Sequence, residues 1–98
     1  MNDKQFTRNL QSVGQSCFVK YFDDFASSTM PREDVIEKLK SETNYTEKSC
    51  ISRTGHARSI IAAGLAAKAL RKVMSSDSAM VSEETRERAN ELLKRYNT

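Results

Sequence analysis

Apolar residues recur at steps of three and four along most of this chain, a spacing typical of helices with one buried face. The longest such run covers residues 3–25. Gly14 lies inside this run, and because glycine costs about 1 kcal/mol relative to alanine in a helix interior, we expect a kink or a close helix approach there. We interpret the main stripe of the run as core rather than as a ligand site; it comprises Phe6, Leu10, Val13, Cys17, Tyr21 and Phe25.

Capping residues mark where further helices begin. Pro31 suits the first turn of a helix, Thr46 is a favourable N-cap, and Ser82 precedes two glutamates in the manner of a helix start. Gly64 either ends one of these helices or lies at a bend in a longer one, and the sequence leaves both open. Together with the apolar spacing, these residues predict helices over residues 31–42, 47–63, 65–75 and 82–96.

No segment has the alternation of apolar and polar residues that is typical of a half-buried strand. The predicted fold class is therefore all-α, a compact bundle of about five helices that forms a single domain over residues 1–98. A polar turn at residues 41–46 separates two of these helices by the spacing of a helix-turn-helix, in which the second helix enters the major groove of DNA. Short helix pairs with polar turns are also common in helical proteins of other functions.

Composition excludes several classes of function. The first five residues are followed by no apolar run, so we expect no secretory leader. No run approaches the roughly 20 apolar residues of a membrane helix, so we expect a cytoplasmic protein without membrane association. Cys17 and Cys50 form no CxxC motif, so we expect buried free thiols and neither a disulfide framework nor a metal site. His56 is the one histidine, and no nucleophile or carboxylate lies at a defined spacing from it. We therefore expect no enzyme activity and no cofactor.

The positive charge of the chain is concentrated in its middle. The formal net charge is +3, but residues 46–75 contain six Lys and Arg against a single Glu, a net charge of +5 for that segment. The flanking segments, residues 1–45 and 76–98, each have one acidic residue more than they have basic residues. Such an asymmetry indicates an anionic partner better than the modest overall pI of about 9.0 does.

A helical wheel of residues 47–63 predicts two chemically different sides. The inward side comprises Cys50, Ile51, Thr54, Ala57 and Ile61, followed by Leu65. The outward side is small, polar and basic, and two of its small residues permit close backbone approach while its cations and histidine can contact phosphate or base edges. The candidate binding residues on this side, with the cations of the next helix, are Lys48, Ser49, Ser52, Arg53, His56, Lys68, Arg71 and Lys72.

Arg58 falls on the inward side of the same wheel. We interpret it as part of the scaffold, either with its charged end reaching solvent or in an ion pair with Asp23, Asp24 or Glu37.

Two functions from different classes remain open. In the first, the basic helix over residues 47–63 binds nucleic acid, which makes the protein a helix-turn-helix-like regulator. In the second, the same helix and its small-residue flank bind a protein, as an adaptor, an inhibitor or a homo-oligomer. Charge favours the first and the small residues favour the second; Gly55 is atypical of a recognition helix. The sequence leaves the oligomeric state open.

Overall fold

The computed structural model describes residues 1–96, so the last two residues of the predicted domain lie outside the described part. Within residues 1–96 the chain forms seven helices and no strand, which confirms the all-α fold class. The later helices begin and end close to the predicted positions. They are α4 (Arg32–Glu42), α5 (Glu47–Ala62), α6 (Ala66–Met74) and α7 (Glu83–Tyr96).

The first predicted helix is divided into three. α1 (Asp3–Val13) ends at Gly14, which takes a φ of +87° that suits glycine alone, and α2 (Gln15–Lys20) follows directly. Tyr21 leaves helical geometry at φ −108° and ψ 20° and separates α2 from α3 (Phe22–Ala26). The kink expected at Gly14 is confirmed, whereas the single helix is wrong, and this division is why seven helices replace about five.

Two other expected boundaries are confirmed. The Thr46 side chain accepts a hydrogen bond from the backbone N–H of Ser49 at 3.1 Å, and so caps α5. Gly64 has a φ of +77°, a conformation that ends α5 rather than bending it. The choice that the sequence left open is therefore settled, and α5 and α6 are separate helices.

The apolar stripes of all seven helices meet in a hydrophobic core. Phe18 is fully buried, with its ring centroid 5.5 Å from that of Phe22 and 6.5 Å from that of Phe25. The aromatic stripe is thus core, as expected. None of the helices formed by residues 1–96 combines the length and the apolar character needed to cross a bilayer.

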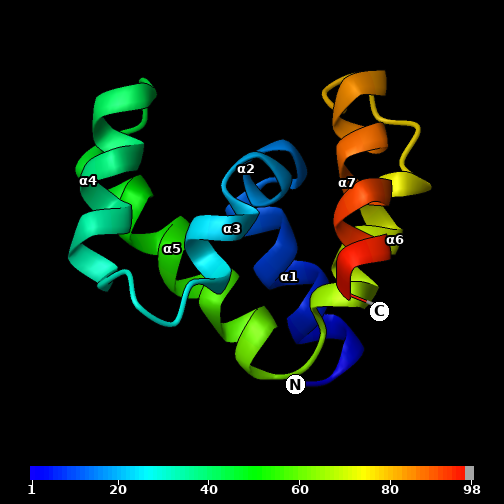
Figure 1. Ribbon diagram of the computed structural model, residues 1–98, viewed down its shortest axis with the longest axis horizontal. Helices are drawn as coiled ribbons and strands as arrows, with labels where there is room; N and C mark the ends of the chain where they lie inside the picture. Colours follow the sequence, from blue (N-terminus) through cyan, green and yellow to red (C-terminus); the bar gives the residue numbers. More distant parts are fainter. Residues whose placement is uncertain (97–98) are drawn as a thin grey trace.

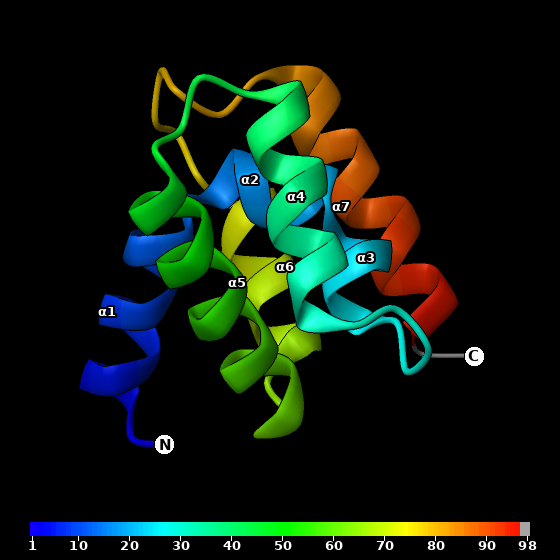
Figure 2. The ribbon, with the colours of Figure 1, turned by 90° about the vertical axis from the view of Figure 1, so that its left-hand side faces the viewer.

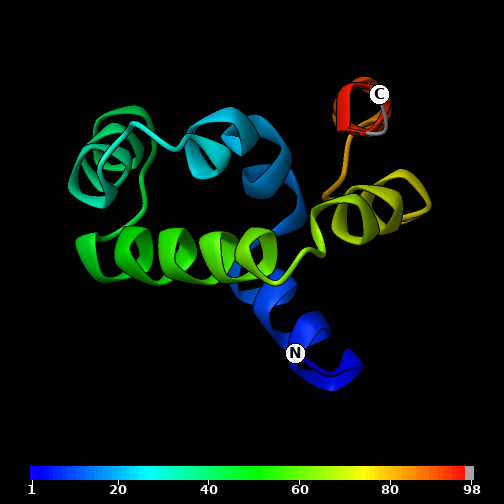
Figure 3. The same ribbon diagram turned by 60° about the horizontal axis from the view of Figure 1, so that its bottom comes forward.

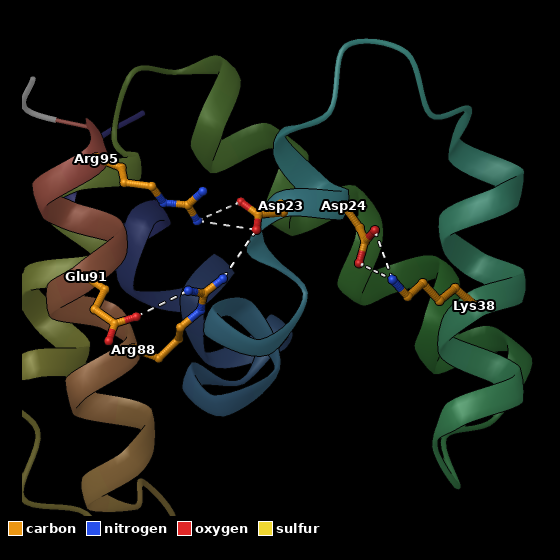
Figure 4. Close-up of polar contacts among 6 residues, drawn as sticks. All are labelled: Asp23, Asp24, Lys38, Arg88, Glu91 and Arg95. Carbon is orange, nitrogen blue, oxygen red and sulfur yellow. Dashed lines mark hydrogen bonds and ion pairs between the residues drawn. The ribbon is translucent and has the colours of Figure 1, made fainter.

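The outer helices lie on two sides of a central group (Figure 1). α5 lies between α1 and α4 (Figure 2), while α7 packs mainly against α6. Two adjacent carboxylates of α3 point to opposite sides and hold these outer helices (Figure 4). Asp23 pairs with Arg95 of α7 at 3.1 Å, whereas Asp24 pairs with Lys38 of α4 at 2.9 Å. The short α3 helix is therefore linked by ion pairs to both α4 and α7.

Candidate interaction surface

α5 is buried along one side and exposed along the other. Its buried side comprises Cys50, Thr54, Ala57 and Ile60, each 0% exposed. Ile51, predicted to face the core, is 40% exposed, and Ile61 is only partly buried. The predicted wheel was therefore turned too far toward Ile51, because Ile60 and not Ile51 takes the buried position.

Arg53 does not face solvent, in contrast to the prediction. Its Nη1 donates a hydrogen bond to the backbone carbonyl of Val13 at 2.6 Å, and its Nε donates to the Ser49 hydroxyl at 2.9 Å. The guanidinium lies 3.7 Å from the ring centroid of Tyr45, a favourable cation–π geometry. A cation at the last carbonyls of α1 also complements the negative end of the helix dipole. Arg53 thus caps α1 at the kink.

Gly14 leaves the space that Arg53 occupies. A Cβ at position 14 would lie 3.0 Å from Nη1 of Arg53, closer than ordinary packing allows. Glycine is therefore favoured here by its positive φ, and a side chain would also make the guanidinium shift by a few tenths of an ångström.

Arg58 belongs to the scaffold, as expected, but it pairs with none of the three acidic residues that were predicted as partners. Its Nη2 donates to the backbone carbonyl of Met30 at 2.7 Å, in the turn that precedes α4. The three acidic candidates pair with other cations: Asp23 with Arg88 and Arg95, Asp24 with Lys38, and Glu37 with Lys40. Two of the cations that made the middle segment basic therefore bind backbone carbonyls inside the fold.

The basic residues of α6 lie apart from those of α5. Lys68 pairs with Asp3 at 2.6 Å and lies 4.7 Å from the ring centroid of Phe6. The hydrogen bond from Lys68 lowers the pKa of the Asp3 carboxyl. Arg71 and Lys72 are exposed, and neither forms an ion pair with any residue of the described chain.

The eight predicted binding residues consequently do not form one surface. Lys48 lies in the first turn of α5, and Figure 3 shows α6 beyond the opposite end of α5. Ser49 and His56 are half-buried, and only Lys48 and Ser52 are exposed among the candidates on α5.

What α5 does expose is a narrow band, here named the α5 stripe. Its members share one helix side at steps of three and four and are mostly small. The exposed members are Lys48, Ile51, Ser52, Ser59 and Ala62, and Gly55 between them is half-buried. Gly55 lies at the centre, and a Cβ added there would have no neighbouring atom within 4 Å. The stripe contains a single charge, on Lys48.

The two cysteine thiols lie in the hydrophobic core. Cys17 is 4% exposed and Cys50 is 0% exposed, and both are free, as expected. Burial raises the pKa of both thiols, and the neighbouring Arg53 guanidinium opposes this rise. A buried thiol with a raised pKa is a poor nucleophile, so these cysteines act as small core residues.

Comparison of the chain with protein-family models, with curated proteins and with solved structures finds no match. Within residues 1–96, no three His, Cys, Asp or Glu side chains lie close enough together to hold a metal ion.

Proposed function

We propose that this protein is a small, non-enzymatic protein-interaction module that binds a helical segment of a partner along the α5 stripe. The main support for this proposal comes from Gly55. It lies in the middle of a helix of 16 residues, where glycine costs about 1 kcal/mol relative to alanine. Its backbone is in an ordinary negative-φ conformation and the space beside it is open. The fold itself makes no use of a glycine here, whereas a partner backbone that approaches closely would.

The neighbours of Gly55 support a protein partner more than a nucleic acid. Ser52, Ser59 and Ala62 continue the small side of the helix, so a second helix can approach over several turns. Ile51 supplies exposed apolar area beside them, at 40% exposure. A single lysine on this side offers little of the phosphate contact on which nucleic-acid affinity depends, because Arg53 and Arg58 bind inside the fold.

The two free thiols support a reducing, cytoplasmic compartment as the place where the protein acts.

Replacement of Gly55 tests the proposal because it separates stability from binding. Gly55→Ala should raise the free energy of unfolding by about 0.5–1 kcal/mol through helix propensity. Gly55→Leu should remain folded, since the added side chain meets open space, and should block the approach of a partner helix. Urea unfolding measures the first effect. Quantitative affinity capture from the source cells, with wild-type and Gly55→Leu protein as baits, measures the second.

Ser12→Leu is the matched control, because Ser12 is exposed on a helix, α1, and is not a member of the stripe. We expect at least one protein whose recovery falls about tenfold or more with Gly55→Leu and is unchanged with Ser12→Leu. If no captured protein distinguishes the two variants, the α5 stripe is not the binding surface.

Nucleic-acid binding is the second candidate, favoured by the exposed Arg71 and Lys72 on α6, which lack ion pairs among residues 1–96. It predicts retention on duplex DNA that weakens steeply with salt. Arg71→Glu with Lys72→Glu should abolish that retention, while Gly55→Leu should leave it unchanged. An absence of salt-dependent retention in the wild-type protein rejects this candidate.

A further inference from the structure

A groove of about 570 Å³ lies between α2 and the first three turns of α7. Ser16, Val19 and Lys20 line it from α2, and Glu84, Glu87 and Arg88 line it from α7. α7 packs mainly against α6 and has a smaller contact with α2. The space beside this smaller contact therefore stays open. Figure 3 shows α7 (orange to red) and α5 (green) at different sides of the molecule. The groove is therefore separate from the α5 stripe.

The α7 side of the groove has negative charge that the fold does not neutralise. Glu83 pairs with Arg86 at 3.6 Å and Glu91 pairs with Arg88 at 3.3 Å. Glu84 and Glu87 are exposed, and within residues 1–96 neither has an ion-pair partner. Two cations also line the groove. Arg88 is shared between Glu91 and Asp23, and the Lys20 ammonium lies 5.5 Å from the ring centroid of Tyr21. Two free carboxylates one helical turn apart therefore border the groove.

An exposed apolar side chain lies on the loop before α7, whose backbone contacts Ser16 of the groove. Met80 is 87% exposed, and its backbone carbonyl is held by the hydroxyl of Ser16 at 3.0 Å. The hydrogen bond fixes the backbone of Met80 beside a residue that lines the groove. Methionine is flexible and polarizable, and proteins use it to contact varied apolar partners. Acidic charge and an exposed methionine thus lie next to the same open groove.

We propose that this groove binds a basic, amphipathic segment of another protein. Lysine or arginine side chains of that segment pair with Glu84 and Glu87, and an apolar side chain packs on Met80. A second copy of this chain fits less well. Its basic helix α6 and this groove are different surfaces, and such a head-to-tail contact does not close into a dimer. With the α5 stripe on another side, the protein can join two partners.

A synthetic peptide of leucine and lysine that forms an amphipathic helix, labelled with fluorescein, tests the groove by fluorescence anisotropy. Glu84→Gln with Glu87→Gln should weaken its binding roughly tenfold, and Met80→Ser should weaken it several-fold. The control is Glu33→Gln with Asp34→Asn, which removes two exposed carboxylates from the first turn of α4. This control should change binding less than about twofold. Circular dichroism confirms that each variant is folded.

Three results would overturn the proposal. One is equal weakening by the control pair, which would mean that the peptide responds to net charge alone. Another is binding that neither groove variant changes. The third is self-association in sedimentation experiments that Met80→Ser abolishes, which would make a second copy the occupant. Backbone amide shifts confined to α2, residues 76–82 and the first turns of α7 on peptide addition would support it. None of these measurements depends on the α5 stripe.

Discussion

At the scale of residues, Arg53 shows why the sequence predicted the chemistry of α5 better than the direction of its side chains. The i, i+4 spacing of Ser49 and Arg53 is visible in the sequence. The acceptor on Val13 is not, because it lies 40 residues earlier in the chain. A charged residue between the buried and exposed sides of a helix can face either way, and a distant carbonyl decided the direction here.

Arg53→Met should destabilise the protein by about 1–3 kcal/mol, because it leaves the Val13 carbonyl without its charged donor while it keeps most of the side-chain volume. Urea unfolding measures the change. Lys48→Met, which removes the same charge from the exposed side of α5, should stay within about 0.5 kcal/mol of wild type. Equal effects from the two variants would contradict the assignment of Arg53 as the cap of α1.

At the scale of elements, helix positions after residue 30 were predicted well and the first helix was not. Steps of three and four persist through residues 3–25 because α1, α2 and α3 all turn the same set of residues toward the core. The break depends on a positive φ at Gly14, which glycine permits but does not require. Similarly, the adjacent Asp23 and Asp24 gave no sequence signal that they would hold opposite helices.

These two carboxylates predict separate local effects. Asp23→Asn should lower the free energy of unfolding by roughly 0.5–1 kcal/mol and speed amide exchange in the last turns of α7, because Arg88 and Arg95 lose their shared partner. Asp24→Asn should act similarly on α4, through Lys38. Hydrogen exchange measured by mass spectrometry distinguishes the two helices, and each variant is the control for the other. Both effects should shrink in 1 M salt, and a change spread over the whole chain would contradict separate roles.

At the scale of the whole molecule, the all-α class followed from amphipathic spacing alone, since one buried face per helix dictates a shared core. The candidate binding surface could be predicted from the sequence only in part. The sequence chose the helix over residues 47–63 as the candidate binding helix and Gly55 as unusual, but it placed too much charge on the outward side of that helix. The net charge of a segment does not show which way each cationic side chain points. Arg53 and Arg58 were therefore counted as surface charge, although both bind backbone carbonyls within the fold.

The stability of the folded protein should fall in alkaline solution. Tyr21 donates a hydrogen bond to Glu42 at 3.1 Å, and burial together with this carboxylate raises the Tyr21 pKa from its usual 10 to about 12. The folded state then binds this proton more tightly than the unfolded state. Its contribution is complete below pH 10 and is lost as the pH rises toward 12.

Urea unfolding from pH 8 to pH 11, in the presence of reductant, measures this loss. The raised pKa values of Cys17 and Cys50 should start the decline nearer pH 9, the usual thiol value. Tyr21→Phe should be less stable at pH 8, where the hydrogen bond is intact, and should decline less steeply above pH 10, by roughly 1–2 kcal/mol over the accessible range. Parallel curves for the two proteins would exclude a role for Tyr21.

The contact between Arg53 and Val13 also couples the end of α1 to the position of α5. Arg53 reaches the Val13 carbonyl only where α1 and α5 are packed together, and the glycine that ends α1 lies against the same guanidinium. The turn at Gly14 and the packing of α5 therefore depend on each other. A shortened chain without α1 would lose more than a helix, because α5 would no longer have a fixed outward side to present.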